Sequence, residues 1–96
     1  MSIPFSPREH STVMLSVDDV AINTPIAAAS TVWIDNRGSS DLLIEFFSNP
    51  LDVDSYRVPP YAAQPISRPP SAANLYLKRP DGSIAGTVFV SQGYGV

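Results

Sequence analysis

Hydrophobic and polar positions alternate with a period of two in several short runs of this chain. Between residues 11 and 17, valine or leucine at every second position alternates with threonine, methionine and serine, as the two faces of a half-buried strand require. Residues 20–26 hold a shorter apolar run that Asn23 and Pro25 interrupt, which indicates an edge strand followed by a loop. The pattern therefore predicts β-strands in the first part of the chain.

Two further segments have the pattern of β-hairpins. In each, a run of β-forming residues is followed by residues that tolerate turn geometry, Asn-Arg-Gly-Ser-Ser-Asp in one and Pro-Asp-Gly-Ser in the other, and then by a second such run. Matching the hydrophobic positions pairs Ile34 with Leu42 in the first hairpin and Leu77 with Gly86 in the second. We expect both hairpins in an antiparallel sheet.

The stretch between these hairpins is dense in proline. Residues 48–70 contain six of the ten prolines, and proline cannot donate a hydrogen bond to the middle of a sheet. We therefore expect loops and edge strands here, with short strands at Ser55–Val58 and Ala63–Ser67. Together the segments predict an all-β protein, a single small antiparallel sandwich or barrel of about seven strands, jelly-roll-like or up-and-down.

Length and composition favour one domain that works with a partner. Ninety-six residues suffice for one core without a metal or a disulfide, and we separate an N-terminal arm, residues 1–10, from a β-domain, residues 11–96. Charged residues make up 16% of the chain and hydrophobic residues 44%, whereas an ordinary domain carries about 25% charged residues. So weakly charged a domain must hide apolar surface against a partner or associate with itself.

Charge and terminal pattern argue against several other partners. A net charge of −3 without a basic run disfavours binding to the phosphates of nucleic acid. The first residues lack the basic and apolar segments of a signal peptide, and no apolar stretch is long enough to span a bilayer. We therefore expect no nucleic-acid partner, no membrane partner and synthesis in the cytoplasm.

No group of residues has the pattern of a catalytic or cofactor site. His10 is the only histidine, and its proline-flanked setting does not suit a catalytic base, which must be held in place. Asp52 and Asp54 alternate like calcium ligands but lack the glycine and glutamate of an EF-hand loop, so the pattern fits either a calcium site or a solvated loop. We predict no enzymatic activity and no cofactor.

Glu45 is the carboxylate that most needs an explanation. It lies within a predicted strand, between Ile44 and Phe46, where a charge is costly unless it is paired. The basic residues that could pair with it are Arg57, Arg68 and Lys78. We expect such pairing, within the subunit or between subunits, rather than catalysis.

Aromatic residues gather on the reverse face of the predicted hairpins, at Trp33, Phe47, Tyr76 and Phe89. Exposed rings would form either a sugar-stacking platform or a protein interface, and a third alternative is that they close the core of a two-sheet sandwich. Because few polar side chains accompany them, we favour an interface over a sugar site. The residues predicted at a protein–protein interface are Phe5, Met14, Trp33, Leu43, Glu45, Phe47, Tyr76, Phe89 and Tyr94.

Two segments resemble hairpins of small all-β virion proteins of tailed bacteriophages. One is the run Ile-Asp-Asn-Arg-Gly-Ser-Ser-Asp-Leu-Leu-Ile-Glu-Phe within Trp33–Phe47, and the other is Asn74–Lys78 with the following Asp-Gly-Ser. The resemblance implies a structural protein of the capsid, neck or tail, located in the virion after synthesis in the host cytoplasm. It also implies symmetric assembly with itself, for example as a trimer, and with other virion proteins, without catalytic residues.

The hypothesis that follows is a non-enzymatic, homo-oligomeric virion structural protein, such as a capsid decoration or cement protein or a neck or tail component. The alternative is a carbohydrate- or receptor-binding β module. The two differ in where the aromatic side chains lie, which is a concave patch with free polar groups for the module and a subunit interface for the structural protein.

Overall fold

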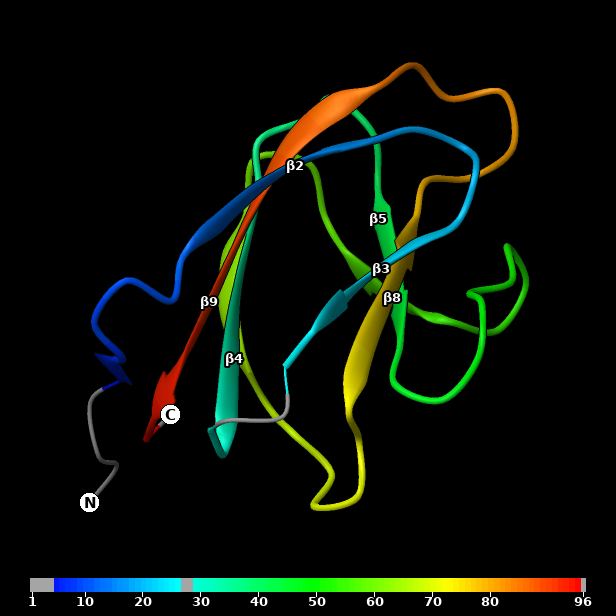
Figure 1. Ribbon diagram of the computed structural model, residues 1–96. Coiled ribbons are helices and arrows are strands. Elements are labelled where there is room, and N and C mark those ends of the chain that lie inside the picture. Colours follow the sequence, from blue (N-terminus) through cyan, green and yellow to red (C-terminus); the bar gives the residue numbers. More distant parts are fainter. Residues whose placement is uncertain (1–4, 27–28, 96) are drawn as a thin grey trace.

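The computed structural model describes residues 5–26 and 29–95, which form β-strands and no helix (Figure 1). In this described part of the chain, no helix has the length and apolar character needed to cross a membrane. The strands are β1 (Ser6–Pro7), β2 (Val13–Val17), β3 (Ile22–Pro25), β4 (Thr31–Asn36), β5 (Leu42–Glu45), β6 (Tyr56–Val58), β7 (Ala63–Ser67), β8 (Asn74–Lys78) and β9 (Gly86–Tyr94).

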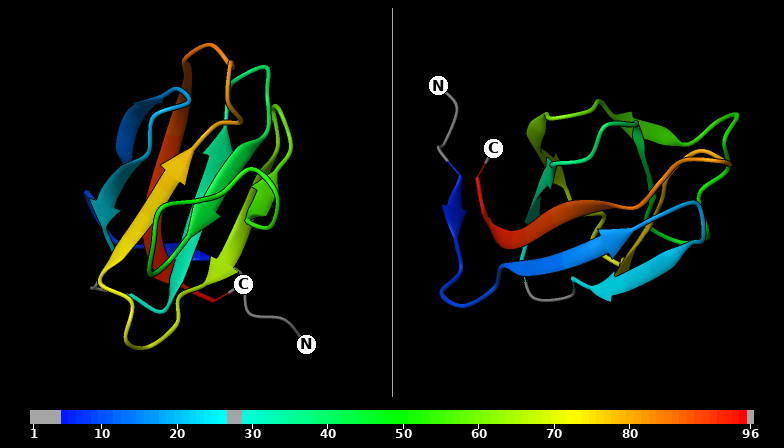
Figure 2. Two further views of the ribbon diagram at one scale, coloured as in Figure 1. Left: turned by 90° about the vertical axis from the view of Figure 1, so that its right-hand side faces the viewer. Right: turned by 90° about the horizontal axis from the view of Figure 1, so that it is seen from above.

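The strands form two antiparallel sheets that pack face to face as a sandwich (Figure 2). Sheet A has the order β2-β9-β4-β7, with β1 also pairing with β9, and sheet B has the order β3-β8-β5-β6. The chain passes from one sheet to the other at every connection from β2 to β9 except the one between β5 and β6. This is the strand order of a jelly roll. The predicted all-β sandwich is therefore confirmed, with jelly-roll rather than up-and-down connections.

Both predicted hairpins are wrong, because their strands belong to different sheets. Ile34 lies opposite Gln64 and Val90 in sheet A, whereas Leu42 lies opposite Val58 in sheet B. The five residues between β4 and β5 can span roughly 17 Å, which is enough to cross the roughly 10 Å between packed sheets. Two strands in facing sheets bury one side each, and so do the two strands of a hairpin, so both arrangements need the same alternation of apolar and polar residues. The alternation alone therefore does not show which of the two forms.

The second predicted hairpin fails in the same way. Leu77 lies opposite Ile22 and Ile44 in sheet B, whereas Gly86 lies opposite Val17 in sheet A. The connection from β8 to β9 therefore runs from one sheet to the other rather than turning back beside its own strand.

The strands that the sequence predicted at the edges of the sheets lie there. β3 and β6 are the outer strands of sheet B, and β7 is an outer strand of sheet A. Pro25 and Pro65 lie within β3 and β7. At an edge, the missing proline N–H removes no bond that a second neighbouring strand would need.

The hydrophobic core lies between the sheets and draws on both of them. Alternate residues of each strand point inward, so that neighbours in sequence alternate between core and surface. The buried core residues are Val17, Ile26, Val32, Ile34, Leu42, Ile44, Val58, Leu75, Leu77, Val88 and Val90.

Two buried polar residues close one end of the core, where the β4–β5 and β8–β9 connections cross. The Asn36 side chain donates from Nδ2 to the carbonyl oxygens of Ser40, Val58 and Pro59 at 3.0–3.1 Å. It accepts at Oδ1 from the backbone N–H of Gly38 at 3.0 Å. Asn36 thus holds the turn after β4 in shape and joins it to the end of β6.

Arg79 is fully buried beside this turn. Its guanidinium donates to the carbonyl oxygen of Val17 at 2.9 Å and to that of Ser40 at 2.8 Å. A Cβ at Gly38 would come within 2.7 Å of its three nearest guanidinium atoms, and one at Gly86 within 2.8 Å of Nη2. Burial lowers the pKa of the Arg79 guanidinium from its ordinary value. Glycine at these two positions makes room for the planar group.

Candidate functional site

The outer face of sheet B is covered by the chain's own β5–β6 loop, residues 46–55. In the left view of Figure 2 this loop (green) crosses in front of β8 and β5. Lys78 of β8 donates to the Asp52 carboxylate at 2.6 Å and to that of Asp81 at 2.9 Å. Leu43, which alternates with the core residues of β5, is fully buried. This predicted interface residue therefore contributes no exposed surface.

Glu45 helps to hold the same loop. It is half-buried in β5 and accepts a hydrogen bond from the Ser55 hydroxyl at 2.9 Å. That hydroxyl accepts in turn from the backbone N–H of Leu51 at 2.8 Å. Glu45 is thus partnered by a serine rather than by the expected basic side chains, because Lys78 binds Asp52 and Arg57 binds Asp41.

The Asp52–Lys78 pair has a defined effect on protonation. Hydrogen bonds from the Lys78 ammonium and from the backbone N–H of Asp81 lower the pKa of the Asp52 carboxyl. Hydrogen bonds to Asp52 and Asp81 raise the pKa of Lys78. The Asp52 carboxylate is therefore paired with the Lys78 ammonium group. In the described part of the chain, no three metal-ligating side chains form a cluster.

The lowered pKa of Asp52 predicts a loss of stability in acid. The unfolded chain binds a proton at Asp52 at a higher pH than the folded chain does, so stability falls as the pH drops from about 4 through the lower folded pKa. In urea titrations, the midpoint of Asp52→Asn should lie below that of the wild type at pH 7 and approach it near pH 3. Asp54→Asn, two residues away and exposed, should follow the wild type at both pH values. If the difference in urea midpoint between Asp52→Asn and the wild type were the same at both pH values, the lowered pKa of Asp52 would not be the cause of the acid sensitivity.

Among the described residues, the outer face of sheet A is covered by the N-terminal segment only at Trp33, against which Phe5 packs. In one cross-strand row Met14 of β2 lies opposite Phe89 of β9, which lies opposite Asp35 of β4. Met14 is 70% exposed, and Phe89 is half-buried. Asp35 pairs with Arg37 at 2.9 Å, so its charge is already compensated within the face.

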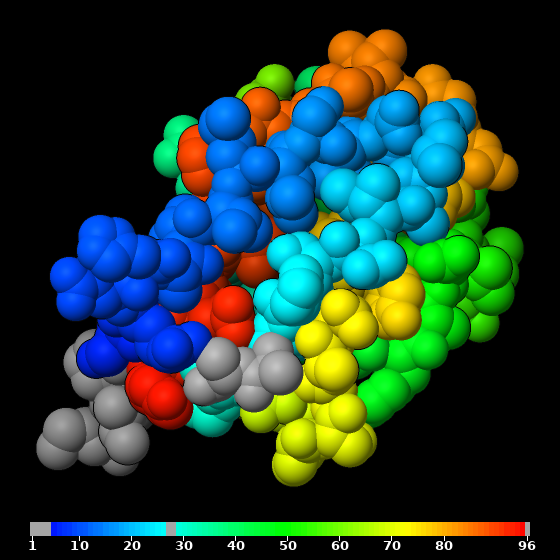
Figure 3. Space-filling view, viewed as in Figure 1, coloured from blue at the N-terminus to red at the C-terminus, as the bar shows by residue number. Residues whose placement is uncertain are grey.

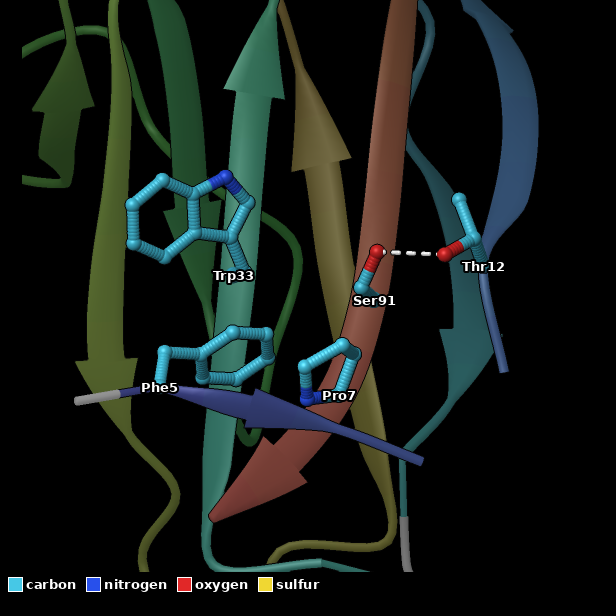
Figure 4. A pocket seen from close by; sticks show the side chains of 5 residues that line it. All are labelled: Phe5, Pro7, Thr12, Trp33 and Ser91. Carbon is cyan, nitrogen blue, oxygen red and sulfur yellow. Dashed lines mark hydrogen bonds between the residues drawn. The ribbon is translucent and has the colours of Figure 1, made fainter. Parts of the chain in front are cut away.

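The next row of this face is hollowed. A shallow depression of about 440 Å³ lies between the N-terminal segment and sheet A (Figure 4). The ring centroids of Phe5 and Trp33 lie 5.4 Å apart with a 34° tilt, and the hydroxyls of Thr12 and Ser91 are hydrogen-bonded to each other at 2.6 Å. The side chains that line the depression are Phe5, Pro7, Thr12, Trp33 and Ser91.

The sequence pointed to Phe5 and Trp33 but missed the other three residues of the depression. Thr12 and Ser91 meet because β2 pairs with β9, a pairing between strands far apart in sequence. Pro7 is brought there by the pairing of β1 with β9. Only a correct assignment of these strand partners would have identified the three residues.

The aromatic residues that we placed on one reverse face lie on different sides of the sandwich, so the prediction of a common face is wrong. Trp33 and Phe89 lie on sheet A, whereas Tyr76 lies in sheet B opposite Glu45. Phe47 is 64% exposed in the loop that follows β5. The hairpin pairing had brought them together, and that pairing does not occur.

The remaining candidates lie near the two termini. Tyr94, the last residue of β9, is half exposed and lies opposite Ser6. His10 lies in the turn between β1 and β2 with its Nε2 at 3.3 Å from the Glu9 carboxylate, and both side chains are almost fully exposed. His10 is thus at the surface, and it is not among the residues that line the depression.

Comparison of the chain with protein-family models, curated proteins and solved structures finds no match. The described residues define a jelly-roll sandwich in which the β5–β6 loop returns over the outer face of sheet B, whereas strands β2, β4 and β9 carry Met14, Trp33 and Phe89 on the outer face of sheet A.

Proposed function

We propose that this protein is a non-enzymatic structural protein that acts by symmetric assembly with copies of itself, as a component of a virion. The observation that carries the proposal is the difference between the two outer faces. The chain covers the strands of sheet B with a loop that the Lys78–Asp52 ion pair holds and that itself exposes Phe47, Leu51 and Val53. On sheet A the strands themselves carry the exposed Met14 and the half-buried Trp33 and Phe89.

The composition of the sheet A face supports a protein partner. Aromatic residues and methionine are enriched in protein interfaces, and charges are depleted at interface centres. The two charged residues near the Met14–Phe89 row, Asp35 and Arg37, neutralise each other. A second copy of this weakly charged chain would bury that row without leaving an unpaired charge.

The virion part of the proposal has a separate basis. It rests on the resemblance of residues 33–47 and 74–83 to virion proteins of tailed bacteriophages, as a capsid decoration or cement protein or a neck or tail component. Jelly rolls occur in viral capsid proteins and also in lectins, and a fold alone does not determine function. The fold is compatible with this role, while the outer face of sheet A supports the assembly on which the role depends.

A charge placed on the outer face of sheet A tests the assembly. We expect light scattering to show an oligomer for the wild type and weaker assembly for Met14→Glu. The dissociation constant of the oligomer should rise about tenfold or more, because an unpaired buried carboxylate costs at least about 1.4 kcal/mol. The control is Ile84→Glu, which adds the same charge at a side chain that is 75% exposed in the β8–β9 loop. It should assemble like the wild type. A wild type that stays monomeric at high concentration, or a Met14→Glu variant that assembles normally, would refute the proposal.

The depression favours a second candidate function, a carbohydrate- or receptor-binding module. Aromatic rings that accompany hydroxyl groups are typical of sugar sites, because a ring stacks on the sugar and the hydroxyls bind its polar groups. Phe5 and Trp33 supply the rings, and Thr12 and Ser91 supply the hydroxyls. Trp33 is the only tryptophan. A monomeric protein whose tryptophan emission changes with added sugar and reaches saturation would replace the assembly proposal with this one.

A further inference from the structure

One edge of β9 is completed by two separate strands from the beginning of the chain. β2 pairs with residues 86–90 of β9, and β1 pairs with its last two residues. The backbone N–H of Arg8 adds a hydrogen bond of 2.7 Å to the carbonyl oxygen of Gln92. The right view of Figure 2 and the space-filling view in Figure 3 show this first segment (dark blue) beside the end of β9 (red).

The end of β9 and Trp33 form a specific binding site for this segment, Phe5–Arg8, which we call the arm. The Phe5 ring packs beside Trp33 and directly over Gly93, where an added Cβ would lie 2.8 Å from the ring. Pro7 lies opposite Gly93, next to the hydrogen-bonded pair formed by Arg8 and Gln92. Because hydrogen-bonded and non-hydrogen-bonded pairs alternate in an antiparallel ladder, position 7 needs no N–H donor, and proline fits there. The site therefore matches the sequence of the arm.

The turn that joins the arm to β2 is strained. His10 has a φ angle of 58°, a left-handed conformation that is unfavourable for a residue other than glycine. Within the turn, the N–H of Ser11 bonds the carbonyl oxygen of Arg8 at 3.2 Å. The Glu9 and His10 side chains are almost fully exposed. An extended turn would relieve the strain at His10 without exposing a buried side chain of the turn.

We propose that in the assembled protein the arm leaves its own β9 and binds the same site on β9 of a second copy. The arm then makes the same backbone bonds and the same Phe5–Trp33 contact between subunits, while His10 extends. Exchange of an identical element between copies needs few new contacts, and a short strained hinge favours it. The inference rests on the proposed function, because the second copy is the neighbour in the assembly.

Cross-linking between two single-cysteine variants tests this exchange. The chain contains no cysteine, and Ser6 lies opposite Tyr94. Isotope-labelled Ser6→Cys and unlabelled Tyr94→Cys, refolded together and oxidised, should form a mixed disulfide that mass spectrometry identifies. The control pairs Ser6→Cys with Ser48→Cys, an exposed position in the β5–β6 loop. We expect a yield about tenfold above the control, corresponding to roughly 1.4 kcal/mol of preference.

The same measurement on the His10→Gly background tests the role of strain. Glycine adopts a positive φ angle at little cost, so the closed turn should be favoured and the mixed disulfide should decrease about fivefold, as expected for roughly 1 kcal/mol. A yield equal to that of the Ser48→Cys control, in a protein that light scattering shows to be oligomeric, would overturn the exchange and leave the proposed assembly intact. A monomeric protein without cross-links would overturn both.

Discussion

Replacing Asn36 with leucine is expected to lower the free energy of unfolding by about 3 kcal/mol, because each buried polar group left unpaired costs roughly 1–3 kcal/mol. Asn36 is fully buried, and its amide serves the carbonyl oxygens of Ser40, Val58 and Pro59 and the N–H of Gly38. Leucine fills a similar volume but satisfies none of these groups. Urea unfolding followed by the fluorescence of the single tryptophan measures the loss.

The matched control for this substitution is Asn23→Leu. Asn23 also lies in a strand, β3, but its side chain is exposed. Its replacement should change the stability by no more than about 0.5 kcal/mol, as is usual at surface positions. Equal losses in the two variants would show that the buried amide is not what holds the turn after β4.

Replacing Arg79 with methionine is expected to destabilise the protein by about 2–4 kcal/mol, because hydrogen bonds to a charged group contribute roughly 1.5–3 kcal/mol each. The buried guanidinium binds the carbonyl oxygens of Val17 and Ser40. Removing a buried charge returns part of this loss, and among the described residues Arg79 Nη2 has no hydrogen-bond partner. The loss should nonetheless exceed that of Arg37→Met, where the arginine is exposed and its ion pair is worth about 1 kcal/mol at most.

A double-mutant cycle with Gly38 separates the packing of Arg79 from its hydrogen bonds. An alanine at position 38 would bring Cβ within 2.3 Å of the nearest guanidinium nitrogen, so Gly38→Ala should destabilise the wild type. In the Arg79→Met background the same change should cost less, because the flexible methionine can move aside. Additive losses would contradict the close packing of Gly38 against Arg79.

The buried end of the core overlaps the sequence pattern from which a virion role is proposed. Asn36 and Gly38 belong to its Asn-Arg-Gly turn, and Arg79 follows directly after the run Asn74–Lys78 of the second segment. In the structure these residues close one end of the core, where the connections cross between the sheets. Their presence therefore follows from the requirements of the fold, and the proposed self-assembly depends on the outer face of sheet A and not on these residues.

Strand positions were predictable because they depend on local pattern. Alternation located β2, and proline placed β3, β6 and β7 at the edges. Strand partners were not predictable in the same way. An alternating apolar run fits equally well beside its neighbour in sequence or across the core from it, since both arrangements bury the same side chains.

The candidate site illustrates the same limit. Phe5 and Trp33 could be selected as large rings in a weakly charged chain, but their meeting depends on β1 binding the last residues of β9. Leu43 was predicted as an interface residue, but it is fully buried in β5, in the sheet in front of which the β5–β6 loop passes (Figure 2). Neither outcome is encoded in a local pattern, because the contacts join residues distant along the chain.

The amino-acid pattern by itself thus determined that this chain is all-β, that Pro25 and Pro65 lie in edge strands and that few of its residues are charged. The tertiary structure alone decided which strands pair, over which outer face the β5–β6 loop returns, and that a buried asparagine and a buried arginine close the core. The physical reason is that alternation and turn residues act over a few positions, whereas strand pairing and burial are set by the packing of the whole chain.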